Sequence, residues 1–438
     1  MNPKVLVATT FCWYPTARLA MALANAGFTV EVVCPRRHPI TKTKVARKIH
    51  HYNGLAPLRS LRAAIADAKP DLIVSGDDLT TRHSHRLYDR ERQAGESGSE
   101  ICSLIERSLG PAESFPVVYA RAAFMEMAER EGVRIPKTGV IENLDDFRNW
   151  IIRNGFPAVL KANGTSGGDG VRVVRTLEEA ESAFRLLQAP PRVLRAAKHA
   201  LLDDDLTLIS PTLRRDRFVV NAQAFVAGRE ATSAVACWKG TALAALHFEV
   251  ISKTSSVGHA TVVRLIENPE MSLAAEKMVR RLNLSGVHGF DFMLEGGTSN
   301  AYLIEINPRA TQVGHLALGP GRDIPAALYA ALSGEAVQPA PKVSEKDTIA
   351  LFPQEWIRDP ESPFLRSAYH DVPWEEPGLV RDCVNNRRKQ SAWYFRAQRK
   401  QAVTAISSPT LVCGATTTTR AQGAQPKSPA VGTELGSR

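Results

Sequence analysis

At 438 residues the chain is too long for one hydrophobic core of ordinary size, so its length predicts two or three domains. Hydrophobic residues make up 44% of the sequence, and no run of about 18 apolar residues occurs, which predicts a folded protein without a membrane span. The first residues contain no apolar core followed by a small-residue cleavage site, so we expect a cytoplasmic protein. Six scattered cysteines lack zinc or redox spacing and are expected to be reduced thiols.

The net charge of +10 is concentrated at the C-terminus. Residues 385–438 contain nine Lys or Arg and a single acidic residue, so the rest of the chain is nearly neutral. A neutral body with a basic tail does not match a groove that follows a phosphate backbone, and we expect no nucleic-acid partner. Residues 401–438 are biased toward Thr, Ser, Ala, Gly and Gln, a composition that predicts disorder.

Strand and helix patterns alternate near the N-terminus. They predict a strand over 4–9, a helix over 17–26, a strand over 29–34, a helix over 58–68 and a strand over 71–75. This order is typical of a parallel, doubly wound sheet, although the segment TTFCWYPT after the first strand has no glycine for a dinucleotide fingerprint. Ligands of such sheets bind past the carboxyl ends of the strands, so residues 9–14 and 76–78 are candidate substrate loops. N-cap and turn roles would explain the same residues.

A glycine-rich loop follows an apolar strand in LKANGTSGGDGV, residues 160–171. Lys161 ends the strand, and four glycines precede the next strand, VRVV. Backbone N–H groups of such a loop can approach phosphate oxygens while a lysine supplies a point charge. No Gly-Lys-Ser/Thr opens a helix here, so this is not a Walker loop, and by itself it is better explained as a hairpin turn.

A second hairpin is predicted from 287 to 307, with its turn centred near residue 298. Antiparallel pairing then places Asp291 opposite Glu305, with β-carbons about 4.5–5.5 Å apart. Asn307 lies on the same face, and three such oxygens suit a hard cation of the Mg²⁺ type. Strict alternation would also put Ala301 and Leu303 on this face and Tyr302 and Ile304 on the other. The alternative is a polar face that simply meets water.

Together these segments resemble the ATP-grasp superfamily, within it the carbamoyl-phosphate-synthetase-like and biotin-carboxylase-like members. The resemblance covers residues 4–334: YLIEINPR (302–309) matches the family's metal-binding strand, FPAVLKANGTSGGDGV (156–171) its phosphate flap and QAFVAGRE (223–230) the link between its two subdomains. The insert between flap and link is long for the family, and Ala224 replaces an acidic residue that is frequent there.

The resemblance implies a role for each matching residue. Those for the nucleotide are Arg121, Lys161, Gly167 and Gly168 at the phosphates, backbone groups around Gln223, Ala224, Phe225 and Val226 at the adenine, and Glu230 at the ribose. Those for Mg²⁺, with Mn²⁺ as an alternative, are Asp291, Glu305 and Asn307. Arg309 would hold the transferred phosphoryl group and act in catalysis together with Lys161.

It also implies a domain order and a reaction. We expect a Rossmann-like pre-ATP-grasp domain (1–114), an ATP-grasp domain (115–334) with a flap subdomain (115–222) and a metal-binding subdomain (223–334), an appended segment (335–400) and the tail (401–438). The expected enzyme is an ADP-forming ligase that joins a small carboxylate to an amine through an acyl phosphate. The alternatives are an ATP-dependent carboxylating or carbamate-phosphorylating enzyme and a non-catalytic ATP sensor. The oligomeric state is left open, with a homodimer as one option.

Two segments of the appended region match no chemistry that we can derive. They are LFPQEW (351–356) and HDVPW (370–374), whose aromatic residues and prolines predict a packing role. His288, just before the metal strand's Asp291, has apolar neighbours and is expected to be a hydrogen-bonded core histidine.

Overall fold

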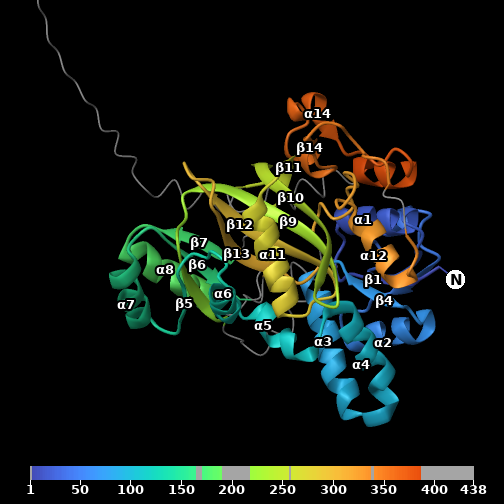
Figure 1. Ribbon diagram of the computed structural model, residues 1–438, viewed down its shortest axis with the longest axis horizontal. Helices are drawn as coiled ribbons and strands as arrows, with labels where there is room; N and C mark the ends of the chain where they lie inside the picture. Colours follow the sequence, from blue (N-terminus) through green and yellow to red (C-terminus); the bar gives the residue numbers. More distant parts are fainter. Residues whose placement is uncertain (1, 164–169, 190–217, 256–257, 337–339, 386–438) are drawn as a thin grey trace, which may run out of the picture. The chain divides into compact units, whose positions relative to one another are not determined.

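The computed structural model describes residues 2–163, 170–189, 218–255, 258–336 and 340–385 (Figure 1). The predicted disordered tail and residues 164–169 of the flap, with three of its four glycines, lie outside these residues. Within the described part of the chain, no helix is long and apolar enough to cross a membrane.

The N-terminal region is a four-stranded, all-parallel sheet in the order β3-β2-β1-β4. Its strands are β1 (Lys4–Ala8), β2 (Thr29–Cys34), β3 (Lys48–His51) and β4 (Leu72–Ser75). Its helices are α1 (Tyr14–Asn25), α2 (Pro57–Ala68), α3 (Asp78–Gln93) and α4 (Ser99–Leu109), with 3₁₀ turns at Pro39–Lys42, Gly95–Gly98 and Ala112–Ser114. The doubly wound parallel sheet is thus confirmed, and β3 is a strand that the sequence pattern did not reveal.

Helices cover both faces of this sheet because its strands are apolar on both sides. Val5 and Val7 of β1 pack with residues of α1, whereas Leu6 and Ala8 pack with residues of α2, α3 and α4. Gly27 ends the α1 segment at φ +109, a conformation that favours glycine, and brings β2 in beside β1.

The next region is a four-stranded antiparallel sheet in the order β5-β8-β6-β7. Its elements are α5 (Phe115–Tyr119), α6 (Arg121–Arg130), β5 (Thr138–Ile141), α7 (Leu144–Asn154), β6 (Ala158–Ala162), β7 (Val171–Val174), α8 (Leu177–Gln188) and β8 (Val220–Ala224). Asn143 and Asp146 form a capping box that starts α7, and Phe147 and Trp150 of that helix pack with Phe184 of α8 and the strands.

The largest sheet has seven strands in the order β13-β12-β9-β10-β11-β14-β15. Its strands are β9 (Gly228–Trp238), β10 (Thr241–Lys253), β11 (Ala260–Leu265), β12 (Gly286–Glu295), β13 (Ala301–Asn307), β14 (Thr348–Ala350) and β15 (Tyr369–His370). The helices of this part are α11 (Pro269–Arg281), α12 (Ile324–Ser333), α13 (Gln354–Arg358) and α14 (Phe364–Ser367). Figure 1 shows α11 lying across the sheet and β14 beside β11, so the C-terminal segment extends the same sheet.

The two faces of the large sheet bury different cores. One face packs under α11 and contains Phe290 and Phe292 of β12. The other shares a core with β1, α1 and α12, to which Ala234 and Ala236 of β9 and Leu351 of the C-terminal segment also contribute. This shared core joins the N-terminal sheet to the large sheet, and Ala310, just after β13, donates to the carbonyl of Ser75 at the end of β4.

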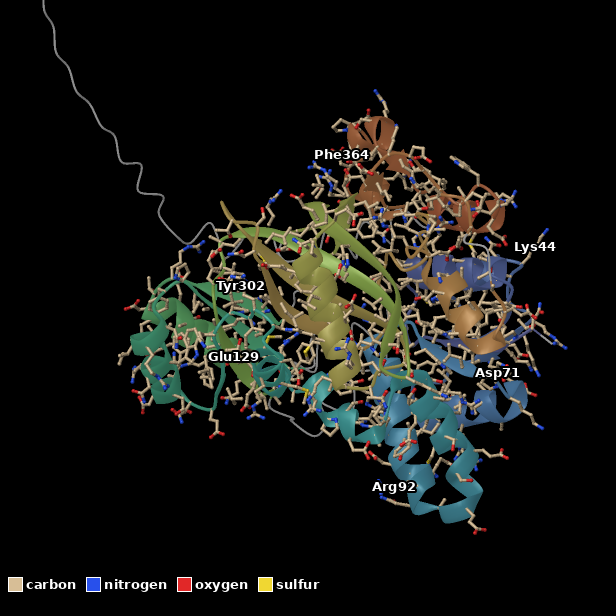
Figure 2. The ribbon with its side chains drawn as sticks, viewed as in Figure 1. Lys44, Asp71, Arg92, Glu129, Tyr302 and Phe364 are labelled. Atoms are coloured by element: carbon tan, nitrogen blue, oxygen red, sulfur yellow. The ribbon has the colours of Figure 1, made fainter. Side chains whose placement is uncertain are left out.

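The β12–β13 hairpin contains a bulge that sequence alternation did not predict. Asp291 pairs with Glu305, but the next pair is Phe292 with Leu303, so the register shifts at Ile304. The expected faces are therefore wrong beyond the bulge: Leu303, like Ala301, packs in the core beneath α11. Tyr302, labelled in Figure 2, instead pairs with Met293 and lies under the Arg134 guanidinium at 5.5 Å.

Candidate active site

Two carboxylates face each other across β12 and β13, as the predicted register requires. Asp291 is paired directly with Glu305, and Gly289 with Asn307. Asp291 accepts hydrogen bonds from Thr232 Oγ1 and from Asn307 Nδ2, both at 2.8 Å. Burial, together with the Glu305 charge, raises the pKa of Asp291 above its ordinary value. The ladder thus holds two like charges together at an energetic cost that a cation would remove.

Basic side chains reach this pair from strand β6 of the four-stranded antiparallel sheet and from α6. Arg121, the first residue of α6, forms an ion pair with Glu305 and donates to the Ala162 carbonyl at 2.7 Å. Lys161 of β6 is 6% exposed, and its Nζ lies 3.5 Å from the Ile304 carbonyl oxygen. Burial lowers the pKa of Lys161 to about 8, although Glu305 opposes the shift. Two cations and two carboxylates therefore meet where the two sheets face each other.

Arg309, two residues beyond the end of β13, connects this cluster to the N-terminal sheet. Its Nε donates to Asp78 Oδ2 at 3.1 Å, and its Nη2 donates to Asn307 Oδ1 at 3.2 Å. Its guanidinium carbon also lies 5.8 Å from the centre of the Trp13 ring. Burial alone would lower the pKa of Arg309, but the nearby carboxylates, first Asp78 and then Asp291 and Asp77, outweigh it and the pKa is raised.

The two candidate substrate loops meet at the carboxyl edge of the N-terminal sheet, where Asp77 and Asp78 have different roles. Asp77 is buried and caps α3 by accepting from Thr80 N at 2.8 Å, and it also binds Thr9 and Thr10. This is the N-cap role that the sequence left open. Asp78, the next residue, instead faces Arg309.

An aromatic group lines the same edge. The Trp13 ring lies 6.1 Å from that of Phe11 and 5.9 Å from that of His259, measured between ring centres. His259 comes from the connection between β10 and β11, so distant parts of the chain meet beside Arg309.

The predicted adenine segment forms the end of β8 and the turn into β9. Gln223 is 4% exposed and donates to Thr138 Oγ1 at 3.1 Å, so its side chain braces β5. Ala224 N donates to Lys137 O at 2.8 Å, and Phe225 N donates to Pro157 O at 3.3 Å. Phe225 is 40% exposed and Val226 is half-buried. Gly167 and Gly168 of the flap lie outside the described residues.

Glu230 lies on β9, where it pairs with Met293 of β12, and its carboxylate forms an ion pair with Lys253 at 2.5 Å. It is also close enough to Lys161 to favour the charged lysine. Lys253 and Thr232 are site neighbours that sequence reasoning missed. Thr232 could have been found from the two-residue period of β9, because it shares a face with Glu230.

The oxygen donors of the hairpin are two carboxylates and one amide. Among the described residues, no cluster of three or more His, Cys, Asp or Glu side chains could hold a metal ion. A cation at the hairpin would therefore bind Asp291 and Glu305 with the amide of Asn307, which suits a hard cation that keeps water or phosphate oxygens in its shell.

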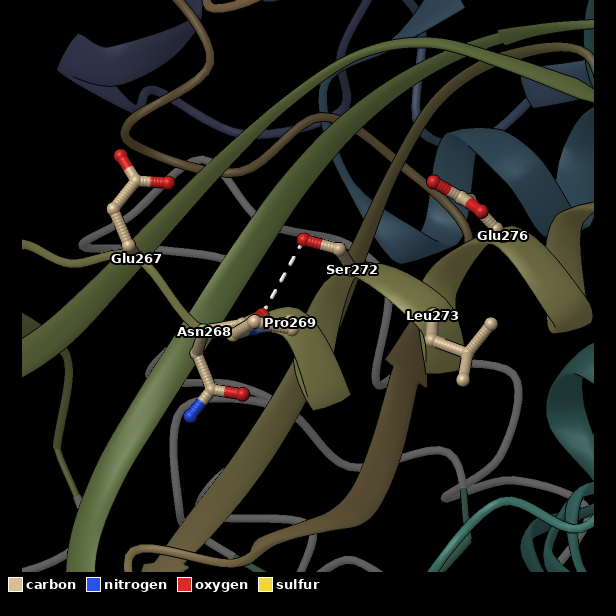
Figure 3. A pocket seen from close by; sticks show the side chains of 6 residues that line it. All are labelled: Glu267, Asn268, Pro269, Ser272, Leu273 and Glu276. Atoms are coloured by element: carbon tan, nitrogen blue, oxygen red, sulfur yellow. Dashed lines mark hydrogen bonds between the residues drawn. The ribbon is translucent and has the colours of Figure 1, made fainter.

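A surface hollow at the start of α11 has a different character (Figure 3). The described residues that line it are Glu267, Asn268, Pro269, Ser272, Leu273 and Glu276. Two of the six are acidic and none is basic, and Ser272 Oγ donates to the Asn268 carbonyl at 3.3 Å. Such a lining would repel a polyphosphate, so the hairpin remains the candidate site.

Comparisons with known proteins agree with the fold and the motifs. Residues 206–313 match the model of the ATP-grasp domain family. The chain is 27% identical over 183 residues to the formate-dependent phosphoribosylglycinamide formyltransferase of Xanthomonas euvesicatoria pv. vesicatoria (strain 85-10). The aligned residues cover 39% of this chain and 40% of that relative. It is 30% identical over 115 residues to the phosphoribosylamine–glycine ligase of Ralstonia nicotianae (strain ATCC BAA-1114 / GMI1000), covering 26% and 22%. The chain thus matches less than half the length of these relatives.

Solved structures share the fold over a longer span. A biotin carboxylase from Campylobacter jejuni matches with a TM-score of 0.54 at 16% identity, covering 77% of this chain and 74% of that one. A carboxyaminoimidazole ribonucleotide synthase from Aspergillus clavatus matches with a TM-score of 0.53 at 16% identity, covering 78% of each chain. These structures show that the chain shares their α/β fold, with its N-terminal parallel sheet, which confirms the predicted fold class. The match of residues 206–313 to the ATP-grasp model agrees with the resemblance seen in the motifs.

Proposed function

We propose that this protein is an ADP-forming ligase that uses ATP and Mg²⁺ to join a small carboxylate to an amine through an acyl phosphate. The observation that carries the proposal is the convergence of the opposed carboxylates Asp291 and Glu305 with Arg121, Lys161 and Arg309. Opposed carboxylates suit a divalent cation, and the surrounding basic groups suit a triphosphate.

The residues of the hairpin fit Mg²⁺ by their donor chemistry. Asp291 and Glu305 supply carboxylate oxygens, and Asn307 supplies an amide oxygen, all at one end of the β12–β13 ladder. Burial, and after it the Glu305 charge, raises the pKa of Asp291, so a cation bound at this pair would favour the ionised carboxylate. When bound, the cation would neutralise phosphate charge, and Mn²⁺ would suit the same oxygen donors.

The basic residues divide into two groups by position. Arg121 and Lys161 belong to α6 and β6 and would neutralise the phosphates of ATP from the side of the flap. A pKa of about 8 keeps most Lys161 side chains protonated at neutral pH, and an approaching phosphate would raise that pKa. The backbone around Ala224 to Val226 and the Glu230 carboxylate would hold the adenosine, as the family resemblance implies.

Arg309 supports the group-transfer half of the proposal. It lies between Asn307 at the metal strand and Asp78 at the carboxyl edge of the parallel sheet. A carboxylate bound at this edge could attack the γ-phosphoryl group of ATP, releasing ADP, and the planar guanidinium would stabilise the charge on the migrating phosphoryl group. An amine would then displace phosphate from the acyl phosphate, and no side-chain nucleophile is needed.

The names of two relatives are compatible with this class of substrates. One is formate-dependent and the other is a glycine ligase, and both formate and glycine are carboxylates. A further relative is the carbamoyl phosphate synthase large chain of Mesorhizobium japonicum (strain LMG 29417 / CECT 9101 / MAFF 303099), 23% identical over 229 residues that cover 50% of this chain and 19% of that relative. It keeps ATP-dependent carboxylation or carbamate phosphorylation as the second candidate, with bicarbonate or carbamate in the place of the carboxylate.

The test is a screen of ATP turnover against pools of amino acids, small carboxylates and bicarbonate. The proposal expects ADP and phosphate to form only when a particular carboxylate is present, and Glu305→Gln to abolish that turnover. Turnover that responds to bicarbonate alone would favour the second candidate. Formation of AMP and pyrophosphate, or tight ATP binding without turnover in any pool, would contradict the ligase.

A further inference from the structure

The segment HDVPW of the C-terminal region contains a deeply buried charge outside the candidate site. Asp371 follows β15, and its side chain is 2% exposed. One carboxylate oxygen forms an ion pair with Arg18 of α1, and the other accepts from His315 Nε2 at 2.7 Å. Burial alone would raise the pKa of Asp371, but Arg18 and His315 hold it below its ordinary range. The carboxylate is therefore charged and joins two segments that are distant in sequence.

His315 belongs to the connection that carries Arg309. Residues 308–323, between β13 and α12, contain neither helix nor strand, so tertiary contacts must fix their conformation. At one end, Ala310 N donates to the Ser75 carbonyl at 3.0 Å, and Thr81 Oγ1 donates to the Pro308 carbonyl at 2.8 Å. In its middle, His315 contacts Asp371. Toward α12, Val343 N donates to the Ala317 carbonyl at 2.9 Å.

The C-terminal segment holds this connection at a second point. Gln354, from LFPQEW, donates to Gln312 Oε1 at 3.4 Å, and Gln312 Nε2 donates to the Ala260 carbonyl at 3.0 Å. The His315 ring depends on Asp371 for its orientation, because its Nδ1 is buried and has no hydrogen-bond partner among the described residues.

Arg18, the other partner of Asp371, lies on the helix that begins beside Arg309. Arg18 lies on α1, and Trp13, at the N-cap position of that helix, has its ring 5.8 Å from the Arg309 guanidinium carbon. Asp371 therefore connects residues 308–323, which carry Arg309, to α1, whose N-cap residue Trp13 lies beside the Arg309 guanidinium.

We infer that Asp371 is a positioning residue for Arg309, which it acts on through His315 and Arg18, so that the C-terminal segment forms part of the active site. The role in turnover rests on the proposed ligase function. The positioning itself does not, because it can be measured on the connection without any substrate.

Four variants separate positioning from plain stability. Asp371→Asn can accept from only one of two donors, because each carboxylate oxygen serves one partner. His315→Phe keeps a ring but loses the bond, whereas His315→Gln retains an amide that can donate to Asp371. Glu355→Gln is the matched control: Glu355 is a fully buried carboxylate of the same segment whose bonds run to Arg358 and Ser362 instead.

Hydrogen exchange of the full-length protein, followed by mass spectrometry of the peptide spanning 308–316, measures the positioning. We expect Asp371→Asn and His315→Phe to accelerate exchange in this peptide about tenfold or more, with His315→Gln and Glu355→Gln close to wild type. Where turnover is found, the first two should lower kcat at least about tenfold while the KM for ATP changes less than about twofold.

Two results would overturn the inference. One is unchanged exchange in the 308–316 peptide of Asp371→Asn and His315→Phe. The other is equal acceleration in Glu355→Gln, which would reveal only a loss of stability. A protein without carboxylate-dependent turnover would refute the proposed function and leave the exchange result to decide the role of Asp371.

Discussion

Neutralising Asp291 should stabilise the protein in the absence of divalent cations while removing its response to them. Asp291 and Glu305 are directly paired across the hairpin, and two charges about 5 Å apart at an effective dielectric of about 20 repel by about 3 kcal/mol. Asp291→Asn removes this repulsion but weakens the hydrogen bonds with Thr232 and Asn307, each about 1 kcal/mol. The net gain in unfolding free energy should be about 1 kcal/mol.

The assay is thermal unfolding in EDTA and in saturating Mg²⁺ with ATP. In EDTA the melting temperature of Asp291→Asn should exceed that of wild type by about 2 °C. With Mg²⁺ and ATP only wild type should shift upward, because a ligand bound at about 100 times its Kd adds about 2.7 kcal/mol. Glu295→Gln is a control on the same hairpin, where hydrogen bonds from Thr298 and Asn300 hold the carboxyl pKa low; it should slightly lower the melting temperature. A lower melting temperature for Asp291→Asn in EDTA, or an undiminished shift with Mg²⁺ and ATP, would refute the reasoning.

Three further predictions concern pH and the tail. Lys161 loses its charge as pH rises through about 8, so calorimetric ATP affinity should fall between pH 7 and 9 in wild type, whereas in Lys161→Arg any binding should be independent of pH over this range. Burial lowers the pKa of five histidines to about 3 or 4. Below pH 6.5 these histidines are protonated in the unfolded state but not in the folded state, so each lowers the free energy of unfolding by about 1.4 kcal/mol per pH unit. The melting temperature should therefore drop steeply from pH 7 to 5.5, and a flat profile would contradict this. These histidines are His38, His83, His85, His247 and His288. Deleting residues 402–438 should leave turnover and melting temperature unchanged, and a tenfold loss of turnover, about 1.4 kcal/mol, would show that the tail contributes to the site.

Local patterns predicted the elements whose residues alternate in a regular way. The strand at Thr29–Cys34 has the predicted bounds, and the hairpin register at Asp291 and Glu305 follows from the distance to the turn. His288 is a buried histidine that donates to the Ser285 carbonyl at 2.8 Å, as its apolar neighbours predicted. Short-range patterns were sufficient here because β2 is an apolar run buried on both faces and the hairpin register follows from the position of its turn.

Features that depend on distant contacts were not predictable. The bulge at Ile304 serves the packing of Leu303 beneath α11, and nothing in the local alternation signals it. β14 and β15 are too short to show a period; β14 forms because it pairs with the edge strand β11, and β15 because it pairs with β14. The contact of Asp78 with Arg309 joins residues 231 positions apart, and that of Asp371 with His315 needs the C-terminal segment to be in place.

The central claim is that a carboxylate is activated as an acyl phosphate, and hydroxylamine trapping tests it most directly. Hydroxylamine in place of the natural amine should yield a hydroxamate together with one ADP per product, and only in the presence of the carboxylate found by the screen. Arg309→Lys should sharply reduce this yield, because an ammonium keeps the charge but loses the planar two-pronged contact. ADP formation with that carboxylate but no hydroxamate, or AMP and pyrophosphate as products, would contradict the account.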